Sequence, residues 1–176
     1  AFMLALPLAA LAGAVLAVVI VQAMAGTRAN SLLIILAGIA VSSFAGAMTS
    51  LALNLSSNPF AALEIMFWML GSLTDRSMTH VWLAAPFILA GWAMLASLGR
   101  PLDALTLGSE TAASMGVDMR RVQFLAVFGT AACVGAGTAV SGAIGFVGLV
   151  VPHILRPLVG ARPSRLLLAS ALGGAC

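Results

Sequence analysis

The sequence contains no lysine and no tyrosine, and charged residues make up only 7% of its 176 residues. A soluble domain needs a polar surface around its core, so this shortage of charge excludes an ordinary soluble globular protein. Its two cysteines, Cys133 and Cys176, provide neither a disulfide framework nor the spacing of a zinc site. A G-x-x-x-x-G-K-[ST] phosphate loop is also missing, so the sequence predicts no nucleotide hydrolysis of its own.

Apolar residues are abundant instead: 62% of the chain is hydrophobic, and the mean hydropathy is +1.14. A membrane-spanning helix needs about 20 mostly apolar residues. The runs predict five complete spans and the start of a sixth: about Phe2–Met24, Leu32–Leu55, Val81–Leu98, Val122–Ala143, the short Phe146–Val159, and a run from Leu166. The predicted fold class is an all-α, polytopic transmembrane helix bundle forming one domain over residues 1–176. Both ends of the sequence lie inside apolar runs, and we expect a fragment of a longer membrane domain.

Arginine is distributed unevenly between the predicted loops. If every run crosses the membrane, one face carries Arg28, Arg100, Arg120, Arg121, Arg156, Arg162 and Arg165, and the other face carries only Arg76. Positively charged loops remain in the cytoplasm, so the arginine-rich face is predicted to be cytoplasmic. The formal net charge of +3 is therefore an orientation signal and does not indicate nucleic-acid binding.

A long cytoplasmic loop is predicted at residues 99–121, "GRPLDALTLGSETAASMGVDMRR". Two short helices fit it, about Asp103–Leu107 and Ser109–Met115, with Ser109 as N-cap and Gly116 as the residue after the second helix. The acidic and basic residues of the loop nearly cancel, whereas anionic lipid would favour a polybasic run. The loop therefore indicates a protein contact, and a merely solvated loop is the alternative.

The stretch "SGAIGFVGLVVPHILRPLVG" predicts an interrupted helix at membrane depth. Gly142 and Gly145 bracket a break, Pro152 removes a helical hydrogen bond, and Pro157 is expected to end the helix. His153 is either part of a substrate or proton site, or a packed histidine beside a kink. Just before the break, Gly135 and Gly137 are expected to face neighbouring helices, because small residues permit close approach.

Three motifs in order carry a family resemblance: "FWMLGSL", "LGSETAASMGV" and "SGAIGFVGLVVPHILRPLVG". With their spacing, and with "LLIILAGIAVSS" and "RLLLASALGGA", the chain resembles the FecCD-like permeases of vitamin B12-type ABC importers from about Ala29 onward. The resemblance implies a partial B12-type permease fold, since a family subunit has about ten helices, roughly twice this chain. In "GARPSRLLL" the chain has Pro163-Ser164 where relatives often have Asp-His.

The resemblance also implies function and partners. A family member is a permease of the bacterial inner membrane that forms a translocation path for ferric siderophores, haem or vitamin B12. Its partners are a second permease copy or homologous half, cytoplasmic ABC ATPases that bind ATP and Mg, and a periplasmic or lipid-anchored binding protein. No catalytic residue, metal ligand or cofactor is implied for this subunit, and no nucleic acid.

Two sets of site residues follow from the resemblance. The ATPase-coupling loop corresponds to Leu107, Gly108, Ser109, Glu110, Ala112, Ala113, Met115 and Gly116. The cytoplasmic gate turn corresponds to Ala29, Asn30, Ser31 and Leu32, although Leu32 is apolar where some relatives are polar.

Two other classes of function remain as alternatives. An ion-coupled secondary transporter would also be polytopic, but Glu64 and Asp75 lie in a predicted outward loop and no intramembrane carboxylates are seen. An intramembrane serine protease could use Ser141 and His153. That family resemblance would require G-x-S-G, and this chain has Ala139-Val140-Ser141-Gly142.

Overall fold

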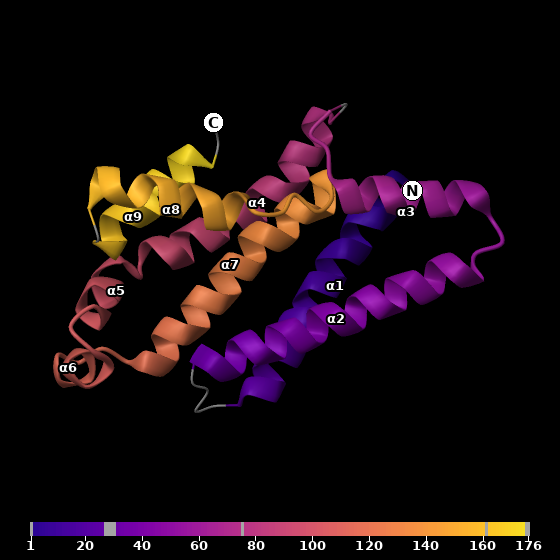
Figure 1. Ribbon diagram of the computed structural model, residues 1–176. Helices are drawn as coiled ribbons and strands as arrows, with labels where there is room; N and C mark the ends of the chain where they lie inside the picture. Colours follow the sequence, from indigo (N-terminus) through magenta and orange to yellow (C-terminus); the bar gives the residue numbers. More distant parts are fainter. Residues whose placement is uncertain (1, 27–30, 75, 161, 175–176) are drawn as a thin grey trace. The chain divides into compact units, whose positions relative to one another are not determined.

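The computed structural model describes residues 2–26, 31–74, 76–160 and 162–174 of the chain (Figure 1). In these ranges the regular structure is entirely helical, as the sequence predicts. The helices are α1 (Phe2–Ala25), α2 (Ser31–Leu55), α3 (Pro59–Leu70), α4 (Met78–Ala96), α5 (Gly99–Leu105), α6 (Ser109–Ser114), α7 (Met119–Ser141), α8 (Val147–Val159) and α9 (Pro163–Gly173).

Four of these helices are long and apolar enough to cross a membrane: α1, α2, α4 and α7. They coincide with four of the predicted spans to within three residues at each end. Helix α8 is apolar but has only 13 residues. At 1.5 Å per residue it is about 20 Å long, shorter than the ~30 Å hydrocarbon core, so its crossing stays a prediction.

The chain forms two compact units, Ala1–Ala85 with Val134–Ala143, and Pro86–Cys133 with Ile144–Cys176. In the first unit α1 and α2 pack side by side (Figure 1). Helix α3 begins at an N-cap, where Asn58 Oδ1 accepts a hydrogen bond from Phe60 N at 3.0 Å. Pro59 occupies the first helical position, where its missing N–H is not needed.

The carboxyl ends of α3 and α7 satisfy each other's free carbonyls in the first unit. Ser72 N donates to Ser141 O at 2.7 Å, and Ala143 N donates to Trp68 O at 3.0 Å. Gly142 lies between these bonds with φ of 76°, as expected for a residue that breaks a helix. The predicted interruption between α7 and α8 is therefore confirmed, and α3 holds it in place.

Helix α7 also approaches α1 closely at a glycine. A Cβ atom on Gly135 would lie 2.8 Å from Ala14 Cβ, whereas a Cβ on Gly137 would meet no described atom within 4 Å. The expectation of close packing is confirmed for Gly135. For Gly137 the described residues show no such contact, so the expectation stays a prediction there.

This difference gives a matched pair of substitutions. Gly135→Leu should destabilise the protein by about 1–3 kcal/mol, since overpacking a tight contact forces the backbones apart. Gly137→Leu should have a much smaller effect. The yield of monodisperse protein and its thermal midpoint in detergent measure both. Equal losses in the two variants would contradict the α1–α7 contact.

In the second unit α8 and α9 pack against each other, and α5 contacts α9 (Figure 1). Helices α4 and α7 approach at backbone level, because a Cβ on Gly91 would lie 2.6 Å from both Gly129 O and Cys133 Sγ. Cys133 Sγ itself donates to Ile88 O at 3.6 Å.

Helix α8 differs from the expectation at its carboxyl end. It continues through Pro157 to Val159 and ends before Gly160, which has φ of 81°. The prediction that Pro157 ends the helix is wrong, because a proline bends a helix without necessarily terminating it. Pro152 lies inside the same helix, and His153 is exposed.

Candidate functional site

The predicted coupling loop forms a compact helical segment in the second unit. Helix α5 begins at Gly99, earlier than the expected Asp103. Leu98, only 2% exposed, anchors the junction with α4, and its carbonyl accepts from Leu102 N at 2.9 Å. Pro101 is tolerated because a proline in the first turn removes an N–H that has no helical partner. This is why the helix can start before the proline.

Helix α6 begins with a glycine cap. Gly108 has φ of 106° and precedes the helix, and its carbonyl accepts from Ala112 N at 3.0 Å. Ser109 is then the first helical residue, so the prediction that Ser109 is the N-cap is wrong. The positive φ of Gly108 lets the chain turn into the helix without a side-chain cap.

One face of α6 is anchored and the other is free. Ala112 is completely buried, while the other residues of the predicted coupling set are all exposed: Leu107, Gly108, Ser109, Glu110, Ala113, Met115 and Gly116. Leu107 and Met115 expose more than 60% of their surface. The segment therefore presents apolar side chains, small side chains and the carboxylate of Glu110 outward from a fixed base.

Backbone hydrogen bonds close both ends of the turn after α6. Gly116 has φ of 84°, Gly116 N donates to Ala113 O at 3.0 Å, and Val117 N donates to Ala112 O at 3.1 Å. These two bonds form a Schellman motif, which confirms that Gly116 is the residue with positive φ that follows the second helix. Asp118 Oδ1 then accepts from Arg120 N at 2.9 Å and caps α7. The segment is thus rigidly connected to a spanning helix.

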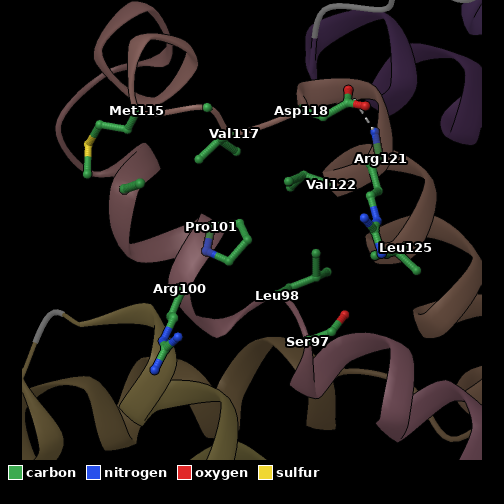
Figure 2. Close-up of a pocket in the computed structure, with 12 residues that line it drawn as sticks. Ser97, Leu98, Arg100, Pro101, Met115, Val117, Asp118, Arg121, Val122 and Leu125 are labelled. Carbon is green, nitrogen blue, oxygen red and sulfur yellow. Dashed lines mark hydrogen bonds between the residues drawn. The ribbon is translucent and has the colours of Figure 1, made fainter.

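A cavity of about 520 Å³ lies between this segment and the start of α7 (Figure 2). It is lined by Ser97, Leu98, Arg100, Pro101, Ala104, Met115, Gly116, Val117, Asp118, Arg121, Val122 and Leu125. Figure 2 shows Pro101, Val117 and Val122 facing one another across the hollow. The lining is mostly apolar, but it includes the charged residues Arg100, Asp118 and Arg121.

Asp103 joins this segment to α9. Asp103 Oδ1 accepts from Ser164 N at 2.9 Å, and Asp103 Oδ2 accepts from Ser164 Oγ at 2.7 Å. These hydrogen bonds from Ser164, followed by the charges of Arg162 and Arg165, hold the pKa of Asp103 below its ordinary value of 3.8. The ionised Asp103 carboxylate therefore contributes fully to the stability of the fold above pH 3.8. This contribution is lost only as the pH falls through the lowered pKa of Asp103.

The pairing of Asp103 with Ser164 was not predicted from the sequence. The two residues are 61 positions apart, and neither belongs to a local capping pattern. The only signal in the sequence was the Pro163-Ser164 pair itself. Proline followed by serine is typical of a helix start, but it does not indicate which carboxylate caps it.

The gate turn is described only in part. Ala29 and Asn30 lie outside the described residues, and Ser31 begins α2. Leu32 is exposed, with 63% of its surface accessible. The gate assignment stays a prediction.

Ser141, the nucleophile of the protease alternative, lies at the carboxyl end of α7. Ser141 is buried, and its Oγ donates to Gly137 O at 2.8 Å within its own helix. A hydroxyl that is already bonded to the backbone and removed from solvent is a poor nucleophile. Across the described ranges no group of three His, Cys, Asp or Glu residues could hold a metal ion.

The four long apolar helices define a multi-pass helical membrane protein. The sequence model of the FecCD transport family matches residues 1–176. The chain belongs to this family.

Individual relatives and one solved structure agree with this assignment. The chain is 34% identical over 170 residues to the Fe(3+) dicitrate transport system permease protein FecD of Escherichia coli (strain K12), covering 97% of the chain and 52% of FecD. It is 38% identical over 178 residues to the vitamin B12 import system permease protein BtuC of Vibrio cholerae, covering 99% of the chain and 51% of BtuC. It is 37% identical over 143 residues to the hemin transport system permease protein HmuU of Yersinia pestis, covering 81% of the chain and 42% of HmuU.

The solved structure is an inward-facing conformation assigned to the metal-chelate type of ABC transporter. It matches with a TM-score of 0.78 and 33% identity, over 83% of this chain and 47% of that one. The chain spans about half the length of the relatives it matches. The predicted family and the predicted all-helical fold are both confirmed.

Proposed function

We propose that the protein is the membrane-spanning permease subunit of a binding-protein-dependent ABC importer that carries metal chelates. The observation that carries the proposal is the match of the FecCD transport family along the whole chain. Relatives named for ferric citrate, hemin and vitamin B12 share one chemistry, a large chelate of a metal ion. The substrate class is therefore a bulky metal chelate.

The segment of residues 99–121 is proposed to bind the ATPase. It is fixed at Ala112 and at the Schellman turn of Gly116, and its outer surface is small and apolar at Ala113, Leu107 and Met115. A rigid, nearly neutral protrusion is suited to a cleft on a protein partner. The ATPase, with its ATP and Mg, then supplies the energy that this chain has no phosphate loop to provide.

The remaining proposals concern location and assembly. The arginine distribution supports an inner-membrane protein with the loops at residues 26–30, 99–121 and 160–165 in the cytoplasm. A second permease copy or homologous half completes the path, a periplasmic or lipid-anchored binding protein delivers substrate, and residues 29–32 form the cytoplasmic gate turn. The exposed His153 is assigned no ligand role.

Dependence on ATP tests the function. We expect proteoliposomes containing the full permease, its ATPase and its binding protein to import at least one of labelled ferric citrate, hemin or cyanocobalamin. Import should require ATP on the side of the membrane where the ATPase is bound. It should persist when ionophores collapse the ion gradients. Import that follows an ion gradient without ATP would favour a secondary transporter and overturn the proposal.

Orientation has its own test. Single cysteines at Ser114 and Ser77 are introduced with Cys133 and Cys176 replaced by alanine, and both positions are exposed. In intact cells an impermeant thiol reagent should label the cysteine at position 77 and spare the one at position 114. Labelling of both after permeabilisation is the control. The reverse pattern in intact cells would contradict the arginine-based topology.

A further inference from the structure

Helix α9 begins with a capping group that its own sequence does not supply. Pro163 is the first helical residue and has no N–H, so Ser164 N is the first backbone donor of the helix. Asp103 accepts from this donor, and its second carboxylate oxygen accepts from Ser164 Oγ. The negative charge of the carboxylate also interacts favourably with the positive amino-terminal end of the helix dipole.

Two residues on one face of α5, Gly99 and Asp103, contact the start of α9. Gly99 and Asp103 are four residues apart and therefore lie on the same side of the helix. A Cβ atom on Gly99 would lie 3.4 Å from Ser164 Cβ, so the first turn of α5 also lies against the start of α9. Two hydrogen bonds to one residue fix the orientation of α5 as well as its distance from α9.

We propose that Asp103 is a positioning residue that makes the ATPase-contacting segment and the α8–α9 hairpin move as one body during transport. The inference rests on the proposed function of that segment. Helix α6 contacts α5, α5 is bonded to α9, and α9 packs along α8 (Figure 1). A displacement imposed on α6 by an ATPase is thereby transmitted to α8, the helix that contains Pro152 and His153.

The hydrogen bonds persist under physiological conditions. Besides Ser164, the charged groups that act on the Asp103 carboxylate are Arg162 and Arg165, and both favour its ionised form. The link is therefore constant over the working pH range, as a mechanical connection requires. Its role lies in transmission and not in pH sensing.

The test uses the complete transporter in proteoliposomes, with Asp103→Ala, Ser164→Ala, the double variant, and Ser164→Thr as the conservative control. The ratio of imported substrate to hydrolysed ATP is measured with whichever of ferric citrate, hemin or cyanocobalamin the wild type imports. In both single variants we expect the ATPase to remain bound and active while this ratio falls about tenfold, the effect of losing a hydrogen bond to a charged group. The double variant should be no worse than Asp103→Ala, because both changes remove one interaction. Ser164→Thr retains the hydroxyl and should retain the ratio.

A distance measurement separates transmission from simple stabilisation. Spin labels replace Arg100 and Leu168, both exposed, in an otherwise cysteine-free chain. Their separation should stay constant between nucleotide-free and ATP–vanadate states in the wild type, and should change in Ser164→Ala. Normal ratios in both single variants, additive losses, or an unchanged separation in Ser164→Ala would overturn the inference. A wild-type permease that never binds the ATPase would instead refute the proposed function on which it rests.

Discussion

Ala113→Arg is expected to reduce ATP-driven import by at least about tenfold while the permease remains inserted and folded. Ala113 is exposed on α6, whereas its neighbour Ala112, about 100° away around the helix axis, is fully buried. The substitution therefore disturbs no internal packing. It places a long charged side chain on a small surface that is proposed to enter a cleft, and a clash of this kind acts against the partner alone. Co-purification of the ATPase and uptake in proteoliposomes measure the effect.

Two further variants test whether a loss of import in Ala113→Arg comes from the long charged side chain. Ala113→Ser adds a single oxygen atom and should leave ATPase binding and import near the wild-type level. Gly116→Val meets no atom within 4 Å, but Gly116 has φ of 84°, so a β-branched residue strains the Schellman turn itself. It should weaken coupling without adding charge. Full ATPase retention and full import in Ala113→Arg would show that the segment is merely solvated.

Gly142→Val is expected to abolish the folded protein or lower its thermal midpoint severely. Gly142 has φ of 76°, which costs a side-chain-bearing residue roughly 1–2 kcal/mol. A Cβ atom there would lie 2.5 Å from Trp68 O and 3.0 Å from Gly71 Cα, both backbone atoms that no rotamer change can move aside. Displacing them would add about 1–3 kcal/mol, a large part of a typical stability of about 5–15 kcal/mol.

Gly145→Val is the matched control for this substitution. Gly145 lies in the same interruption, but a Cβ there meets no described atom within 4 Å, and its φ is not in the left-handed region. Size-exclusion profiles and thermal unfolding in detergent should show near-normal behaviour for this variant and aggregation or loss for Gly142→Val. Similar profiles for the two would mean that the junction of α3 and α7 is not under the constraint described.

The spanning helices and the break after Ser141 could be predicted from the sequence because they depend on local properties. Runs of apolar residues determine insertion, and glycines mark positions where the chain reverses or leaves a helix. Gly116 lies after α6, as its sequence position predicts. Helix α5 begins four residues earlier than predicted, because Pro101 resembles a helix breaker although the first turn of a helix tolerates it.

Contacts between segments that are far apart in the sequence could not be predicted in the same way. Gly135 and Gly137 are equivalent in sequence, but only Gly135 faces Ala14 of α1. The hydrogen bond between Asp103 of α5 and Ser164 of α9 joins residues that are 61 positions apart, so the sequence around one residue does not reveal the other. Local patterns indicate which face of a helix is small or polar, but they do not indicate which partner meets it.

The close approach of α4 and α7 has a kinematic consequence. A Cβ on Gly91 would lie 2.6 Å from Gly129 O, and a Cβ on Gly129 would lie 3.2 Å from Gly91 O, so main chain faces main chain. Side chains can absorb sliding between helices by changing rotamer, but backbone atoms have no such freedom. Residues 86–96 of α4 and residues 119–133 of α7, which belong to the second unit, are therefore expected to move together as one stiff body.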